Sequence, residues 1–221
     1  FNYSMKLDAT LLKGLVLSLD MTGTRSENKN TSYSTIDAAY NFSPVQTLRY
    51  TNGDLASISG SNPLVAVDGL GGYIRNKMNM GTITASLNYD VPWVKGLSAY
   101  LRATFDNNNS TQKTFDSPVT LYLYDEQTGD ITEDPLTTYP KAKITLEETN
   151  RFVDNKLLEF GANYNHTFAG KHDVSGLIVV NYQDYKNRYL TGKNEDMPGI
   201  YPEIMGTATS AKLTGSEVYT Q

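Results

Sequence analysis

Apolar and polar side chains alternate with a period of two along much of this chain. The clearest case is the segment 79–106, where two alternating arms flank one short turn. Its apolar positions are Ile83, Ala85, Leu87 and Tyr89 in the first arm and Leu97, Ala99, Leu101, Ala103 and Phe105 in the second. A helix would instead repeat its apolar residues every three to four positions. The pattern therefore predicts two antiparallel strands that have one apolar and one polar face.

The same pattern occurs twice more. Residues 2–10 and 15–22 alternate on either side of a turn at 11–14, and residues 158–165 and 174–182 do so around a turn at 169–172. Between these hairpins the periodicity is lost, and we expect long loops over 24–76, 107–154 and 185–221, with a small hairpin near 121–130 inside the second. The chain is thus predicted to contribute about six main strands.

Two environments give strands with one apolar face. In a soluble β-sandwich that face meets a second sheet, whereas in a transmembrane β-barrel it meets lipid and each strand needs roughly 9–11 residues to cross. Each arm here alternates over a comparable length, and Trp93 lies near Tyr89, where an interfacial aromatic girdle would be placed. Short turns at one end and long loops at the other are also typical of outer-membrane barrels, whose long loops are extracellular. We predict an all-β fold, part of an antiparallel transmembrane β-barrel, with a soluble sandwich adhesin as the alternative.

Composition narrows the functional classes. The chain has 221 residues, no cysteine and a net charge of −5, without a basic stripe, so no nucleic-acid partner is expected. No stretch approaches the roughly 18 apolar residues of a membrane-spanning helix. Because Phe1 already lies at the start of an alternating run, we interpret residues 1–221 as an internal part of a longer protein.

Catalytic and metal chemistry find little support in the sequence. The two histidines, His166 and His172, flank one short turn with a spacing that matches no metal motif. The acidic residues of the second loop lack the spacing of a calcium-binding EF-hand, and neither a nucleophile motif nor a phosphate-binding glycine loop is present. We expect no enzyme activity, no metal site and no cofactor.

The polar face of the central hairpin carries the better binding candidates. These are Asn88, Tyr100, Arg102 and Asp106. Aromatic rings stack on the apolar patches of sugars, while amide, guanidinium and carboxylate groups bond the hydroxyls. The alternative is that these side chains only solvate the barrel lumen or contact a plug.

Several motifs resemble those of one transporter family. They are Leu12-Lys13-Gly14-Leu15, Ser61-Asn62-Pro63-Leu64, the run from Tyr89 to Ser98 with Phe105-Asp106 and Lys113-Thr114-Phe115 beyond it, and the run from Asn163 to Val174. In this order they resemble the mid-barrel of the SusC-like TonB-dependent transporters of Bacteroidetes.

This resemblance implies a plugged 22-stranded barrel of the bacterial outer membrane. It further implies that residues 1–221 are part of this barrel domain, with the signal peptide, the plug domain and the remaining strands outside them. It also implies a TonB-type energising protein, a surface lipoprotein of the SusD type, and uptake of glycan oligosaccharides or similar nutrients. A passive porin-like channel is the alternative within the membrane class.

Overall fold

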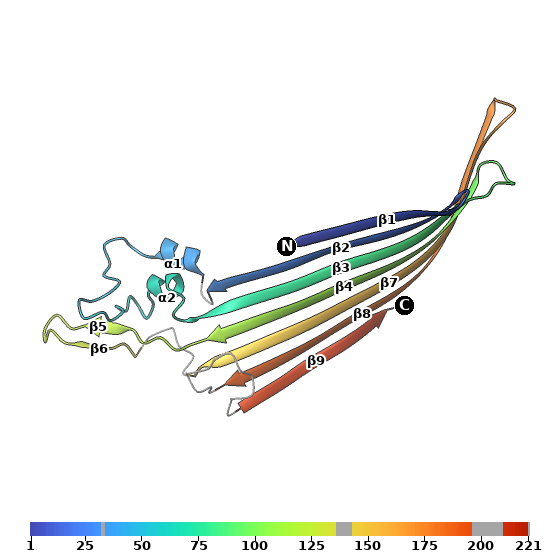
Figure 1. The fold of residues 1–221 in the computed structure, drawn as a ribbon. Coiled ribbons are helices and arrows are strands. Elements are labelled where there is room, and N and C mark those ends of the chain that lie inside the picture. The colour runs from blue at the N-terminus through green and yellow to red at the C-terminus, as the bar shows by residue number, and fades with distance from the viewer. Residues whose placement is uncertain (32–33, 136–142, 196–209, 221) are drawn as a thin grey trace.

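One antiparallel sheet dominates the computed structural model, which describes residues 1–31, 34–135, 143–195 and 210–220 (Figure 1). Seven strands follow one another in the order β1-β2-β3-β4-β7-β8-β9. Their bounds are β1 Asn2–Leu12, β2 Leu15–Thr31, β3 Gly72–Asp90, β4 Leu97–Asp116, β7 Thr145–Phe168, β8 His172–Glu195 and β9 Ser210–Thr220. The predicted all-β, antiparallel fold class is confirmed.

The connections differ in length at the two ends of the sheet, as the sequence predicts. The turns between β1 and β2, β3 and β4, and β7 and β8 lie together at one end, and the described parts of the connections from β2 to β3 and from β4 to β7 lie at the other (Figure 1). Two of the short turns contain a glycine in a left-handed conformation that also touches the next strand. Gly14 has φ +82°, and its carbonyl oxygen accepts a hydrogen bond of 2.7 Å from the backbone N–H of Asp90.

 Gly96 has φ +85°, and its carbonyl oxygen accepts a hydrogen bond of 2.8 Å from the backbone N–H of Asn165. A side chain at either glycine would be strained, so the turns need glycine there.

The strands run farther toward the long loops than the alternation predicts. The segments 24–76, 107–154 and 185–221 were expected to be loops, but β2 continues to Thr31, β4 continues to Asp116 and β7 already begins at Thr145. The last segment also holds the end of β8 and the whole of β9, which makes seven strands in the sheet rather than six. In these extensions polar residues predominate on both faces, so the period of two disappears although the ladder of backbone hydrogen bonds continues.

The register confirms which residues share a face. Ile83 is opposite Phe105, Ala85 is opposite Ala103 and Leu87 is opposite Leu101. The polar residues pair on the other face, where Thr84, Ser86 and Asn88 lie opposite Thr104, Arg102 and Tyr100. We call these the apolar face and the polar face of the sheet.

The apolar face forms a continuous band across six strands, next to the short turns. Its members include Leu7 and Leu19 on β1 and β2, Leu87 and Leu101 on β3 and β4, and Phe160 and Val180 on β7 and β8. On β4 the band reaches from Leu97 to Phe105, which is about 26 Å at about 3.3 Å per residue. The rings of Tyr89 and Trp93 lie 6.1 Å apart at its short-turn end, as the aromatic pattern predicts.

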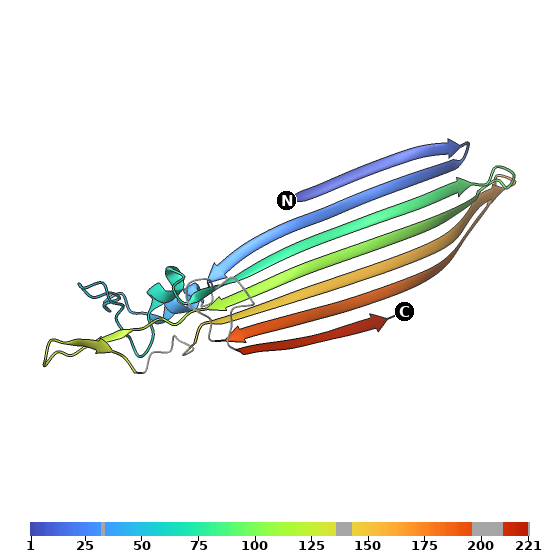
Figure 2. The same cartoon turned by 60° about the horizontal axis from the view of Figure 1, so that its bottom comes forward.

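No described element packs on the apolar face. In Figures 1 and 2 the sheet is a single curved layer along its length. Side chains of the band are correspondingly exposed, with relative accessibilities of 54% for Leu7, 50% for Phe160 and 68% for Ile178. The second sheet that a soluble sandwich requires is missing from the described residues.

The cluster of buried hydrophobic side chains lies instead among the long connections. Leu55, Val65, Val119 and Leu121 form a small core that joins the first long connection to the second. This module holds helices α1 (Thr35–Asn41) and α2 (Pro63–Val67) and the hairpin of β5 (Tyr122–Tyr124) and β6 (Ile131–Glu133), which matches the small hairpin expected there. Within the described ranges, no helix is long and apolar enough to cross a membrane.

Asn62 fixes the fold of this module. Its side chain is fully buried, and its amide nitrogen donates to the carbonyl oxygens of Leu48 and Ala56 at 2.7 and 2.8 Å. Its side-chain oxygen accepts from the backbone N–H of Leu64 at 2.8 Å and so caps α2. The motif around Asn62-Pro63 is thus a structural element of the loop module.

On the polar face, the ring of Tyr100 lies over Gly161 on the neighbouring strand. A Cβ atom added to Gly161 would overlap this ring, whereas a Cβ added to Gly176 would meet nothing within 4 Å. The glycine therefore leaves the space that the tyrosine ring fills, a cross-strand pairing that stabilises glycines in sheets.

We predict that Gly161→Ala lowers the free energy of unfolding by about 1–3 kcal/mol, because the Tyr100 ring must move. The matched control Gly176→Ala should have an effect within about 0.5 kcal/mol. Urea unfolding of the full-length protein in detergent micelles measures both. In a Tyr100→Ala background the penalty for Gly161→Ala should disappear, and an unchanged penalty there would contradict the proposed contact.

Candidate functional site

The four residues predicted for binding all lie on the polar face of the sheet. Asn88 on β3 is directly opposite Tyr100 on β4, and Arg102 follows Tyr100 on the same face of β4. Asp106 is on this face too, but it lies about 13 Å along the strand from Arg102, at about 3.3 Å per residue. The structure therefore brings three of the candidates together and places Asp106 in a separate group.

The first group is organised by an ion pair between neighbouring strands. Nη1 of Arg102 lies 3.3 Å from Oε1 of Glu159, its register partner on β7. The guanidinium carbon of Arg102 is 5.4 Å from the centre of the Tyr100 ring. The carboxylate holds the guanidinium beside the ring, and this cation–π contact fixes the relative position of two groups suited to ligand binding.

The chemistry of this group suits a polar oligomer. The Arg102 side chain is 47% exposed, while that of Glu159 is 17% exposed, so the guanidinium is the more accessible partner. A guanidinium donates several hydrogen bonds in a fixed plane and binds carboxylates with two of them. The Tyr100 ring adds a flat apolar surface beside it. The group can therefore bind either sugar hydroxyls or the carboxylates and carbonyls of a peptide.

Asp106 belongs to a second group that connects four strands. Thr82 on β3 donates to one carboxylate oxygen at 2.7 Å, and Asn155 on β7 donates to the other at 3.1 Å. Gln183 on β8 then donates to the side-chain oxygen of Asn155 at 2.7 Å. Both carboxylate oxygens already accept hydrogen bonds within the sheet, which favours a structural role for Asp106 over ligand binding.

Sequence reasoning missed the partners that organise both groups. Glu159 has a visible signal, because it is a charged residue between Leu158 and Phe160 on an alternating strand. Asn155 and Gln183 lie at the limits of the predicted strands, where the alternation fades. All three are identified only by the pairing register of β4, β7 and β8.

Metal ligands do not gather anywhere in the described part of the chain, where no group of three or more His, Asp or Glu side chains could hold an ion. His166 instead packs edge-on against Phe168, with ring centres 4.6 Å apart. In the acidic second connection, Asp134 is buried and accepts a hydrogen bond from the hydroxyl of Ser57. This bond joins the two long connections.

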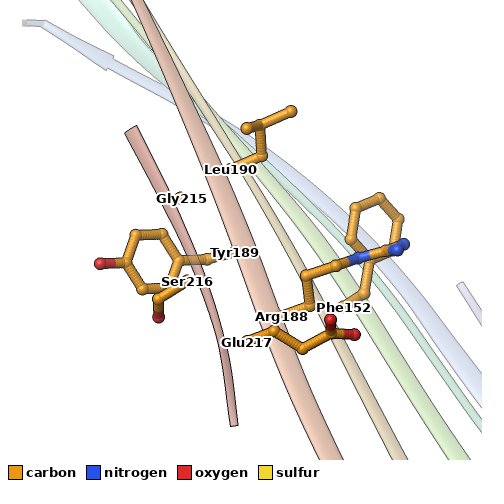
Figure 3. A pocket seen from close by; sticks show the side chains of 7 residues that line it. All are labelled: Phe152, Arg188, Tyr189, Leu190, Gly215, Ser216 and Glu217. Atoms are coloured by element: carbon orange, nitrogen blue, oxygen red, sulfur yellow. The ribbon is translucent and has the colours of Figure 1, made fainter. Parts of the chain in front are cut away.

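A hollow of about 410 Å³ lies on the opposite face of the sheet, beyond the apolar band (Figure 3). The guanidinium of Arg188 lies 5.0 Å from the centre of the Phe152 ring, and Glu217 lies across from Arg188 on β9. The other residues that line it are Tyr189, Leu190, Gly215 and Ser216. This hollow lies on the face of the sheet opposite to the candidate site and shares no residue with it.

Comparisons with known proteins identify the fold and little else. No model of a known protein family matches the chain, and no curated protein sequence does so. Solved structures do match: a structure of the RagAB peptide transporter superposes with a TM-score of 0.65 at 14% identity, covering 98% of this chain. Structures of the RagAB peptide importer in the closed-closed and open-open states match with a TM-score of 0.63, also at 14% identity.

The matched region is a minor part of those proteins. This chain spans 24% of the length of each matched chain. At this identity the likeness establishes a common fold, so the fold described here is also found in part of a transporter.

We predict that Asp106→Ala lowers the free energy of unfolding by about 1–3 kcal/mol, because it leaves Asn155 and Thr82 without their acceptor. Asn88→Ala, on the same face of the sheet, serves as the control and should change it by less than about 0.5 kcal/mol. Chemical unfolding of the full-length variants in micelles gives both values. Equal effects of the two substitutions would remove the distinction between the two groups.

Proposed function

We propose that residues 1–221 are part of the β-barrel of a SusC-like TonB-dependent transporter in the bacterial outer membrane, which imports oligomeric nutrients. The observation that carries this proposal is the band of exposed apolar side chains on one face of a single-layer sheet. Burying such a band is worth about 25 cal/mol for each Å² of apolar surface removed from water. Lipid supplies that burial, and it needs no second protein layer.

The free edges of the sheet favour a closed barrel. In the described residues, β1 pairs only with β2, and β9 pairs only with β8. Within hydrocarbon, each unpaired backbone N–H or C=O costs several kcal/mol, so spanning sheets close into barrels. Both edges therefore call for further strands, in agreement with a larger barrel of which this sheet is one part.

The two ends of the sheet suggest its orientation. Outer-membrane barrels have short periplasmic turns and long extracellular loops. We therefore assign the turns at 11–14, 91–96 and 169–172 to the periplasmic side and the loop module to the extracellular side. The polar extensions of β2, β3, β4, β7 and β8 then stand above the membrane and carry the module.

The partners and the cargo follow from the family proposal. A TonB-type protein would supply energy through a part of the transporter outside residues 1–221, and a lipoprotein of the SusD type would deliver substrate at the extracellular side. The family resemblance implies glycan oligosaccharides or similar nutrients, whereas the matched structures are described as peptide transporters. The Tyr100–Arg102–Glu159 group suits both glycans and peptides, so we propose both classes as candidate substrates.

Energy coupling separates this proposal from a passive porin. Cells that express the full-length protein should lose uptake of its substrate when a protonophore collapses the membrane potential, and the sequence before Phe1 should encode a plug domain and a TonB-contacting segment. Uptake that survives the protonophore, with a signal peptide leading directly into strands, would assign the chain to the porins.

We predict that Leu101→Arg and Thr104→Arg differ in their effect on insertion. An arginine on the lipid face near the midplane costs roughly 2–4 kcal/mol, whereas one on the lumen face costs much less. Leu101→Arg should therefore reduce the yield of folded full-length barrel in membranes more strongly than Thr104→Arg does. If Thr104→Arg were the more damaging, the apolar face would be packed against protein and the soluble sandwich would be favoured.

A further inference from the structure

One hollow in the apolar band combines small apolar residues at its floor with one lysine side chain at its edge. Its floor is the cross-strand pair Ala85 and Ala103, and the larger side chains around it are Ile83, Phe105, Leu158 and Tyr182. Its volume is about 490 Å³, and Lys156 lines it as well. The hollow is therefore an apolar groove with one cationic side chain.

Lys156 lies at the end of the groove nearer the long loops. It is opposite Phe105 on β4 and Asp184 on β8, so it shares a row with the last apolar residues of the band. On β2 and β3 the first charged residues of this face, Arg25 and Lys77, lie farther toward the long loops. Lys156 and Asp184 thus carry charge at the edge of the band, where a long lysine side chain reaches the interface.

The Lys156 ammonium is only loosely held by the protein. Its nitrogen is 3.9 Å from the Asp184 carboxylate, and its side chain is 64% exposed. Charge-assisted hydrogen bonds between such groups are usually about 2.7–2.9 Å long. By comparison, Lys186 on the next row lies 2.7 Å from Glu217 and 4.8 Å from the centre of the Tyr219 ring. Of these two lysines, Lys156 is the one that can pair with an external anion.

A second hollow in the band provides an internal comparison. It is lined by Leu87, Tyr89, Ala99, Leu101 and Phe160 with Tyr100, and no charged residue contributes to it. Its volume is about 170 Å³. Of these two hollows in the apolar band, only the groove over Ala85 and Ala103 has a charged side chain in its lining.

We propose that the groove over Ala85 and Ala103 binds one lipid that carries a negatively charged phosphate group. An acyl chain fills the groove between Phe105 and Leu158, and the ammonium of Lys156 pairs with the phosphate at the interface. Asp184 and Asp154, which is on the next row of β7, limit the site to a single anionic headgroup. This inference rests on the membrane position proposed above.

Native mass spectrometry of the full-length protein, titrated with dioleoyl phosphatidylglycerol or with dioleoylglycerol, tests the proposal. The wild type should retain phosphatidylglycerol about tenfold more than dioleoylglycerol, since a hydrogen bond to a charged group is lost with the phosphate. Lys156→Gln should abolish this preference, and Ala103→Leu, which fills the groove, should reduce the binding of both lipids. Ala99→Leu, in the uncharged hollow, should leave the preference unchanged.

The result separates this inference from the proposed function. A Lys156→Gln variant that forms the folded barrel in membranes but still prefers phosphatidylglycerol over dioleoylglycerol as strongly as the wild type would overturn the lipid site alone. A protein that fails to form a barrel in membranes would overturn the proposed function first. Equal losses from Ala99→Leu and Ala103→Leu would show that the hollow over Ala85 and Ala103 is not a specific site.

Discussion

The backbone hydrogen bonds between neighbouring strands are the constraint on which this structure depends. Every strand of the main sheet is paired with its sequence neighbour in the sheet, so the seven-stranded meander needs no crossover. In lipid these bonds have no competitor, since hydrocarbon offers neither donors nor acceptors. In the proposed membrane barrel, the side chains are then free to follow their surroundings: apolar toward lipid, polar toward the lumen, and mostly polar on both faces beyond the membrane.

This separation of backbone and side-chain roles explains how far the sequence could predict the fold. The alternation identified β1 and the parts of β2, β3, β4, β7 and β8 where the two faces meet different environments. Past Asp106 the side chains of Lys113 and Thr114 are both polar although they lie on opposite faces. No periodic signal remains there, yet the ladder continues to Asp116, so the loops were predicted to begin too early.

The candidate site could be predicted only in part, because the alternation gives the face on which a residue lies but not its neighbours on other strands. The face that carries Asn88, Tyr100, Arg102 and Asp106 follows from period two alone. The division into two groups depends on cross-strand partners such as Glu159 and Asn155, which only the register of β4 and β7 specifies. A stretch of sequence shows which residues share a face of one strand, but not which residues of another strand lie beside them.

The central claim is that one face of the sheet contacts lipid over a limited band, and spin labels can measure this directly. The chain has no cysteine, so single cysteines can be placed from Leu97 to Asp116 of the full-length protein in vesicles. We predict that oxygen accessibility alternates over 97–105, with maxima at the odd positions, and that both faces become accessible to a polar nickel complex beyond Asn107. Maxima at the even positions, or alternation that continues unchanged to Asp116, would contradict the account.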